Sequence, residues 1–490
     1  MSIAPRLSLT ALPASVARPS YTPAQHGVGI VHIGLGAFHR AHQAVYTDTA
    51  LGVAGGDWRI AAASLRSTAV ATELAAQQGL YTLIERDAGG DRARVIGSIA
   101  QALAGPDVVA MLLERMASPD TRIVSLTVTE KAYGLDRAHA GIDVDHADVA
   151  ADLLAPRRPR GVCGLLVEGL RQRRERGLAP FTVLCCDNLP DNGRLLAGAV
   201  IDLARHSDPA LADWITARAS FPSTMVDRIT PRVGEQTLAD AQRLTGCVDP
   251  AAVEAEPFTQ WVIEDRFPLG RPAWELAGAH MVDSVAPYER MKLRMLNGAH
   301  SLIAYAGFLG GCDFVRDAMA WPALAAWVRR LMAQAAATLE PLPGIDTADY
   351  ARQLRERFEN PAIRHATAQI AMDGTEKMPQ RILEPAMVAI GRGLPMDAFA
   401  FATACWMRYA LARHDDGRPY PRNDPRDAAI DARLRDRTDS AEDIYDALSG
   451  LPFGAPEGLW LQDRWREAVI VALRRLLARG TRDGLPVAPG

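Results

Sequence analysis

Residues 27–50 read GVGIVHIGLGAFHRAHQAVYTDTA, and this stretch decides the fold. It begins with a short apolar run bounded by glycines and continues with Phe38, Ala41 and Val45 at helical spacing, which predicts a strand, a tight turn and a helix. A second apolar run at 58–65 follows about 25 residues later, which is typical of a βαβ unit with a crossover helix. We therefore expect a parallel sheet in the N-terminal half.

The rest of the chain extends this pattern and then changes it. Apolar runs at 121–128 and 181–186 predict two more buried strands, separated by enough residues for helices. From about residue 286 the long Ala- and Leu-rich segments are all helically periodic. We predict an α/β fold with a doubly wound sheet domain at 1–285 and a mainly α-helical domain at 286–490, with the ligand in the cleft between them.

Composition narrows the classes of function. The chain has 490 residues, 48% hydrophobic and 23% charged, which is typical of a globular protein with two or three domains. A formal charge of -4 provides no overall field for a nucleic acid or an anionic membrane. No run approaches the roughly 20 apolar residues of a membrane span, and we expect a cytoplasmic protein that acts on a small ligand.

The six cysteines form no C-x-x-C pair, and the eleven histidines show no recognised metal-ligand spacing. We therefore expect neither a disulfide framework nor a metal site. A zinc-dependent dehydrogenase stays an alternative that loss of activity on chelation would support.

The glycines of the first turn point to a dinucleotide. Gly34 and Gly36 occupy the first two positions of G-x-G-x-x-G, where the backbone must approach a pyrophosphate, but His39 stands at the third, and a plain tight turn is the alternative. Near the end of the second strand, Arg66 and its neighbouring hydroxyls provide no carboxylate for a ribose, so NAD and NADP both remain open. His39, Arg40 and His42 either touch cofactor phosphates or lock the first helix to the sheet.

Residues 287–300, PYERMKLRMLNGAH, carry the catalytic candidates. On an α-helix, His300 and Asn297 lie about 80° and 140° round from Lys292, so the three side chains fit one broad face. Hydride transfer from an alcohol needs a base for the hydroxyl proton and donors for the oxyanion, roles that suit a desolvated lysine and an amide. The alternative is a solvated lysine, a capping asparagine and an interhelical histidine.

Two further polar residues add to this set. Asn188 follows the strand at 181–186 and is either a second oxyanion donor or part of an Asx turn. Asp227 lies among apolar residues, where a carboxylate either pairs, for example with Arg228, or contacts a ligand.

The segments IVHIGLGAFHRAHQA, SLTVTEKAYG, CCDNLPDNG, MVDRITP, EPFTQWVIEDRFPLGRPAWE and MKLRMLNGAH, in this order, resemble the long-chain, metal-independent mannitol dehydrogenase and fructuronate reductase family. The similarity spans nearly the whole chain. It implies a Rossmann-type NAD(P)-binding domain, a helical substrate domain, and zinc-free oxidoreduction between a 2-ketose and its alcohol.

The resemblance also implies roles for single residues. Lys292 looks like the general base, Asn188 and Asn297 like oxyanion-binding amides, and His300 like a substrate-binding residue. Asp227 matches an aspartate near the substrate and Glu289 a glutamate beside the lysine, while Gly34, Gly36 and Phe38 fall in the cofactor turn. At 68 and 69 this chain has Thr and Ala where NAD-preferring mannitol dehydrogenases tend to have an acidic pair, which weakens an inference to strict NAD dependence.

Which branch of the family the chain resembles depends on whether its substrate carries a carboxylate. A hexuronate pocket needs a fixed cation that a hexitol pocket lacks. Lys131, Arg294 and the run from Gln369 to Arg381 resemble fructuronate reductases, and we expect Lys377 and Arg381, with Lys131 as a further candidate, to bind the carboxylate. Arg294 lies about 200° from Lys292 and should face away. The predicted reaction is D-fructuronate to D-mannonate, and the alternative is D-mannitol to D-fructose.

Other classes of function are less favoured. Basic runs at 157–160 and 171–176 could form a nucleic-acid patch, but the interspersed Glu175 and the nearly neutral chain favour a solvated helix face. A non-catalytic NAD(P)-binding protein is possible, because fold does not imply function. We expect a sugar acid or polyol as the partner, and a monomer or weak oligomer.

Overall fold

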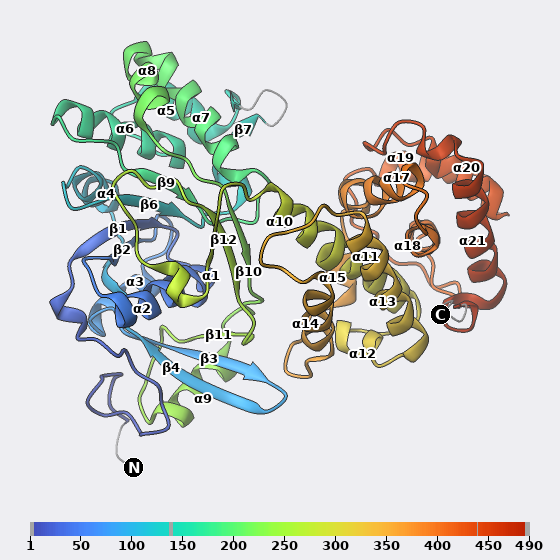
Figure 1. Ribbon diagram of the computed structural model, residues 1–490, viewed down its shortest axis with the longest axis horizontal. Coiled ribbons are helices and arrows are strands. Elements are labelled where there is room, and N and C mark those ends of the chain that lie inside the picture. The colour runs from blue at the N-terminus through green and yellow to red at the C-terminus, as the bar shows by residue number, and fades with distance from the viewer. Residues whose placement is uncertain (1–3, 137–140, 439, 486–490) are drawn as a thin grey trace. The chain divides into compact units, whose positions relative to one another are not determined.

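Five parallel strands form the central sheet of the first of two units, in the order β5-β2-β1-β6-β9. The computed structural model describes residues 4–136, 141–438 and 440–485, and the chain divides into the units Met1–Ala286 and Pro287–Gly490 (Figure 1). The sheet strands are β1 (Val28–Ile33), β2 (Arg59–Ala63), β5 (Ile99–Leu103), β6 (Ile123–Leu126) and β9 (Thr182–Cys185). Four of them lie in the predicted apolar runs, and the predicted parallel sheet is confirmed.

Alternating side chains of β1 pack on opposite faces of this sheet. Val31 and Ile33 pack into a core with the helices on one face, and Ile30 packs into a second core on the other. Both faces are therefore buried, which explains why the strands read as continuous apolar runs. The helices of this unit are α1 (Ala37–Ala41), α2 (Gln43–Ala54), α3 (Ala69–Ala76), α4 (Val108–Met116), α5 (Ala147–Leu154), α6 (Val162–Glu175), α7 (Asn192–Ser207), α8 (Pro209–Arg218) and α9 (Glu235–Thr245).

Smaller sheets flank the central one and were not predicted. β3 (Tyr81–Asp87) and β4 (Gly90–Ile96) form an antiparallel hairpin that β11 (Val253–Ala255) extends. β12 (Gln260–Glu264) pairs with β10 (Thr224–Asp227) and β13 (His280–Val282), and β7 (Leu135–Asp136) pairs with β8 (Gly141–Ile142). Short 3₁₀ turns, η1 (Pro23–Gln25), η2 (Glu130–Ala132) and η3 (Trp274–Ala277), complete the unit.

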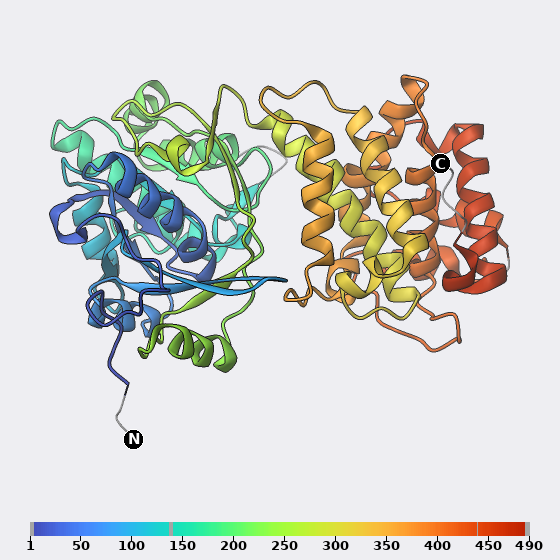
Figure 2. The same cartoon turned by 60° about the horizontal axis from the view of Figure 1, so that its bottom comes forward.

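The second unit consists of helices, as predicted (Figure 2). The apolar helix α11 is almost wholly buried and packs against α13, α15 and α18, while α18 packs against α21. Its elements are α10 (Ala286–Met291), η4 (Lys292–Asn297), α11 (Gly298–Leu309), α12 (Val315–Met319), α13 (Pro322–Ala337), α14 (Thr347–Glu359), α15 (Thr367–Ala371), α16 (Gly374–Met378), η5 (Pro379–Leu383), α17 (Glu384–Gly391), α18 (Asp397–Ala410), α19 (Asp427–Leu434), α20 (Ala441–Ser449), η6 (Leu459–Leu461) and α21 (Asp463–Gly484).

Two segments of this unit, η4 and η5, are π-helices, and the described residues contain no others. The α-helical geometry predicted for Lys292 to Asn297 is therefore wrong. Hydrogen bonds in a π-helix span five residues, so successive side chains turn by less than 100°. Such segments are rare and often occur at functional sites.

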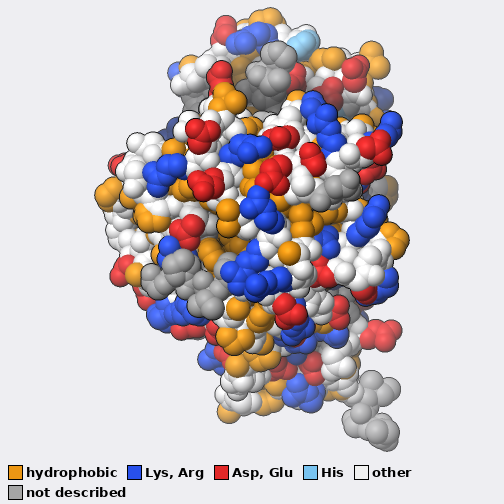
Figure 3. Space-filling model, turned by 90° about the vertical axis from the view of Figure 1, so that its right-hand side faces the viewer, with side chains coloured by type: hydrophobic (Ala, Val, Ile, Leu, Met, Phe, Trp, Pro, Cys, Tyr) orange, Lys and Arg blue, Asp and Glu red, His pale blue; other side chains and the backbone are white. Residues whose placement is uncertain are grey.

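The surface carries charges of both signs. Arg466 and Arg474 of α21 pair with Asp446 and Glu442 of α20. Figure 3 shows basic side chains lying among acidic ones on one face. Of the helices that the structure describes, none is long and apolar enough to cross a membrane.

Candidate active site

The first glycine turn is built so tightly that only glycine fits at its first position. Gly34 has a φ of +108°, and a Cβ there would lie 2.0 Å from the Thr127 carbonyl oxygen. The Gly34 N–H donates to Ala63 O at 2.9 Å, which joins the ends of β1 and β2. At Gly36, in contrast, a Cβ would meet only the Gly34 oxygen, at 3.9 Å. Packing therefore requires Gly34 but leaves the space beside Gly36 open for a ligand.

We expect alanine at these two positions to separate folding from cofactor binding. Gly34→Ala should lower the free energy of unfolding by about 1–3 kcal/mol, because the methyl group forces the backbone to move. Gly36→Ala should cost under about 1 kcal/mol and still weaken NADH binding, because its methyl group occupies the open space. Urea unfolding and NADH fluorescence titration measure the two effects. Equal stability losses in the two variants would contradict this account of the turn.

A cavity of about 600 Å³ opens at this turn. Its lining includes Gly34, Gly36, the exposed Arg66, Thr127 and Arg160. Its volume is in the range of small-molecule sites, and it lies at the carboxyl ends of the strands, where doubly wound sheets bind nucleotides. The open glycine backbone and the two cations fit a dinucleotide pyrophosphate or phosphate.

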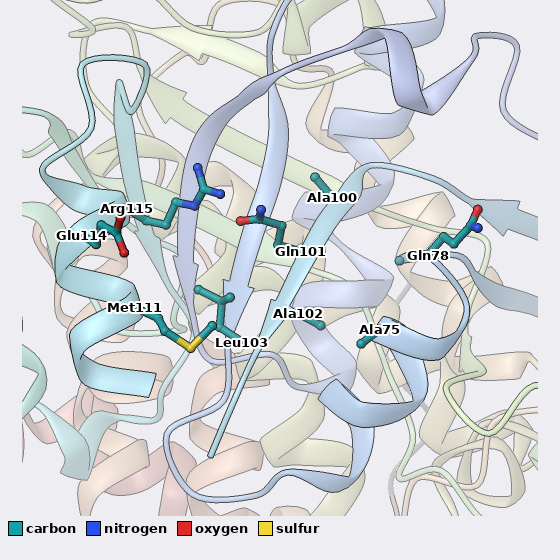
Figure 4. A pocket seen from close by; sticks show the side chains of 10 residues that line it. Ala75, Gln78, Ala100, Gln101, Ala102, Leu103, Met111, Glu114 and Arg115 are labelled. Atoms are coloured by element: carbon teal, nitrogen blue, oxygen red, sulfur yellow. The ribbon is translucent and has the colours of Figure 1, made fainter. Parts of the chain in front are cut away.

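A second cavity, of about 390 Å³, lies beside β5 at the edge of the sheet. Gln101 of β5 and Arg115 of α4 point toward one another there, with Met111 and Leu103 nearby (Figure 4). None of the predicted cofactor residues lines it.

The basic residues of the first helix contact protein groups. Arg40 donates to Ala251 O, and its own carbonyl accepts from the Tyr81 hydroxyl at 2.6 Å. The His39 ring stacks on His32 with ring centroids 3.5 Å apart, and His42 Nε2 is 3.1 Å from Gln260 O. These contacts tie the first helix to β1 of the central sheet and to β3 and β12 of the smaller sheets, in line with the second of the two roles that the sequence left open.

The loops after β6 and β9 carry two predicted residues, the exposed Lys131 and Asn188. The Asp187 carboxylate joins the loops by accepting from the Val128 N–H at 2.9 Å and the Tyr133 hydroxyl at 2.6 Å. Asn188 therefore follows a residue that is firmly held.

Phe38 and Asp227 lie elsewhere in this unit. Phe38, on α1, stacks with His42 at 5.0 Å. Asp227 is buried at the end of β10, and the Arg228 guanidinium donates to Glu85 Oε1 at 2.7 Å and to the Ala41 and Glu256 carbonyls.

In the second unit, the two π-helices bring four functional candidates together. Lys292 and Asn297 lie on η4, His300 follows on α11, and Arg381 of η5 approaches Asn297 O and Ser301 Oγ at 3.5 and 3.4 Å. Lys292 and His300 are buried. At Gly298 a Cβ would lie 3.1 Å from Arg381 O, so a small residue is needed for this approach.

The surroundings of His300 in this cluster disfavour the charged form of its imidazole. Its burial lowers its pKa well below the usual value, and the charges of Arg357, Arg381 and Lys292 lower it further. Its Nε2 atom is buried without a hydrogen-bond partner among the described residues. A buried ring nitrogen without a protein partner fits a ligand contact.

Arg381 is a cation without a carboxylate partner among the residues that the structure describes. Burial lowers its pKa, while Tyr305 and the Asp373 carboxylate act in the opposite direction, and its guanidinium approaches Asn297 O and Ser301 Oγ. Arg357, from α14, is buried near the same histidine. Arg381 therefore provides a guanidinium that can bind an anionic ligand.

Lys377 and Glu289 are placed differently. Lys377 lies on α16, and its ammonium donates to Ile370 O and Met372 O at 3.3 and 2.6 Å and lies 3.5 Å from Asp373 Oδ2, so residues just before α16 engage it. Glu289 lies on α10, half-buried, one turn before Lys292.

Sequence reasoning missed three residues near the candidates. His365 lies 5.1 Å from His300 between ring centroids, Arg357 is buried near His300, and Asp187 joins the two loops of the first unit. Only Asp187 had a signal in the sequence, since it follows a predicted strand. The described residues contain no cluster of three or more His, Cys, Asp or Glu that could hold a metal ion.

Comparison with known proteins covers both units. Residues 28–276 match the family model of the mannitol dehydrogenase Rossmann domain, and residues 284–450 match that of the mannitol dehydrogenase C-terminal domain. The matched segments together span most of the chain.

Three similar proteins have informative names. The D-mannonate oxidoreductase of Escherichia coli (strain K12) is 42% identical over 96% of this chain and 97% of its own length. The mannitol 2-dehydrogenase of Cereibacter sphaeroides is 40% identical over 95% and 99%. The mannitol 2-dehydrogenase of Pseudomonas fluorescens, solved as a ternary complex with NAD and D-mannitol, superposes with a TM-score of 0.80 at 36% identity over 97% of each chain.

Proposed function

The chain belongs to the mannitol dehydrogenase family and is an NAD(P)-dependent oxidoreductase acting on CH–OH groups, and from this premise we propose that it reduces D-fructuronate to D-mannonate. Reduction adds one hydride to the ketone carbon and one proton to its oxygen. NADH or NADPH, when bound, supplies the hydride. The remaining tasks fall to side chains of this chain.

Lys292 is the proposed acid. Its ammonium gives a proton to the oxygen as the alcohol forms, and in the reverse direction the neutral amine takes that proton back. The Asn297 amide donates to the same oxygen and stabilises its developing charge. Asn188 is the proposed amide donor of the first unit, and His300 Nε2 binds a substrate hydroxyl.

The single observation that carries the choice of a hexuronate is Arg381. Its guanidinium is half-buried beside Asn297 and Ser301 and forms no ion pair with a carboxylate among the described residues. A cation held away from water in this way is unfavourable unless an anion joins it. A uronate carboxylate provides that anion, whereas mannitol and fructose are neutral. We assign the carboxylate to Arg381 and give Lys377, on α16, a supporting role.

The mannitol 2-dehydrogenase reaction is the second candidate. The relatives named for mannonate and for mannitol differ by only two percentage points in identity to this chain, so similarity alone does not separate them. Lys292, Asn297 and His300 serve both reactions.

The cofactor is proposed to be NADH or NADPH at the glycine turn. The similar structure of the mannitol 2-dehydrogenase from Pseudomonas fluorescens contains NAD. In this chain Arg66 and Arg160 line the cavity and Thr68 and Ala69 provide no carboxylate, which also suits a 2′-phosphate.

The test is turnover of the purified protein. NADH or NADPH oxidation is followed by absorbance with D-fructuronate, D-tagaturonate, D-fructose and D-xylulose, each with and without chelator. We expect kcat/KM for D-fructuronate to exceed that for D-fructose by about 10- to 100-fold, the value of one charged hydrogen bond. Chelator should have no effect. A preference for D-fructose would favour the mannitol reaction, and loss of activity with chelator would favour a metal-dependent enzyme.

A further inference from the structure

Thr129, in the loop after β6, has a backbone conformation that side chains rarely adopt. Its φ is +77° and its ψ +145°, close to the region that only glycine occupies freely. Such a residue persists only where its surroundings force it. In this chain it stands between the wall of the glycine-turn cavity, which includes Thr127 and Val128, and the short helix η2 that carries Lys131.

One carboxylate accepts hydrogen bonds from this segment. Asp187 Oδ2 accepts from the Val128 N–H at 2.9 Å, and Asp187 Oδ1 accepts from the Thr129 N–H at 3.3 Å. Oδ2 also accepts from the Tyr133 hydroxyl at 2.6 Å, and Tyr133 is fully buried. Three donors on both sides of the strained residue therefore converge on one side chain.

The main chain of Asp187 is held as firmly as its side chain. Its carbonyl oxygen accepts from Leu189 N–H at 2.8 Å and from Asn192 Nδ2 at 3.2 Å. Asn192 in turn bonds Thr224 through both ends of its amide. Asn188 lies between Asp187 and Leu189, within this set of hydrogen bonds, so its position depends on Asp187.

We propose that Asp187 is a positioning residue that holds Thr129 in its strained conformation and thereby fixes both the Thr127–Val128 wall of the cofactor cavity and the loop that presents Asn188. This inference deepens the proposed function and rests on it for the role of Asn188. The role at the cavity wall does not depend on which sugar is the substrate.

Asp187→Asn tests the positioning role. Asparagine has a single acceptor oxygen, so its NH₂ group must face one of the three donors and that hydrogen bond is lost. We expect weaker binding of NADH or NADPH, measured as a higher Kd. We also expect kcat to fall by about 10- to 100-fold, because the Asn188 amide is displaced from the substrate oxygen. Asp249→Asn is the matched control, because this buried carboxylate also accepts backbone N–H groups, those of Thr82 and Ala251, away from the cavity. It should lower Tm and leave cofactor binding unchanged.

Thr129→Gly tests the strain. Glycine adopts the observed φ without cost, so Thr129→Gly alone should raise Tm. In the Asp187→Asn background the loop has relaxed, and the same change should lower Tm, because only the entropic cost of glycine remains. In the Asp249→Asn background it should still raise Tm.

Two results would overturn the proposal. One is an equal effect of Thr129→Gly on Tm with and without Asp187. The other is an Asp187→Asn protein that is less stable but retains the wild-type Kd and kcat. The comparison of Tm between the single and double variants and the cofactor Kd need no sugar substrate. Both measurements therefore test the proposal even if the proposed substrate is wrong.

Discussion

Lys292→Met should lower kcat for the reduction of D-fructuronate by about 10²- to 10⁴-fold, the usual contribution of a general acid or base. Lys292 is the proposed proton donor on η4, and a thioether holds no proton to give. Stopped-flow absorbance of NADH or NADPH, with the sugar at saturation, measures this loss directly.

Lys292→Arg is the matched variant. It keeps the positive charge in the cluster but cannot release a proton near neutral pH. We expect a loss of kcat as large as that of Lys292→Met. Near wild-type turnover in Lys292→Arg would show that Lys292 acts through its charge alone and would remove it from the role of acid.

Arg381→Met should change the choice of substrate. Loss of its hydrogen bonds to a carboxylate is expected to lower kcat/KM for D-fructuronate by about 10- to 100-fold. D-fructose has no carboxylate, so its kcat/KM should be nearly unchanged. The measured quantity is the ratio of the two kcat/KM values in the variant and in the wild type.

Arg294→Met provides the control for this experiment. Arg294 lies on the same π-helix as Lys292, but its guanidinium donates to Thr338 O and Thr338 Oγ1 at 3.0 Å. Its loss should lower Tm and keep the substrate ratio. If Arg294→Met and Arg381→Met lower the ratio equally, the cation cluster does not select the carboxylate through Arg381.

The central sheet could be predicted from the sequence, but the hairpin β3–β4 could not. The strands of the central sheet are buried on both faces and read as apolar runs. Arg86 of β3 instead pairs with Asp91, Asp240 and Glu254, so charges stand where a strand pattern would show apolar residues. That network depends on partners about 150 residues away, which local periodicity does not show.

The sequence allowed us to name candidate site residues, but it did not allow us to predict how they are arranged. Asn297 and His300 were identified as candidates from residue chemistry and the family resemblance. The π-helical path of η4 has no signal in the sequence, and the approach of Arg381 to Asn297 joins segments 84 residues apart. The sequence also does not show that the Lys377 ammonium, on α16, donates to the Ile370 and Met372 carbonyl oxygens.

Product analysis with labelled cofactor tests the central claim most directly. The purified protein is incubated with D-fructuronate and reduced cofactor carrying deuterium at the transferable position, and the product is identified by NMR. The account predicts D-mannonate with one deuterium on the carbon that bore the ketone. Unchanged D-fructuronate, beside conversion of D-fructose to labelled D-mannitol under the same conditions, would contradict it.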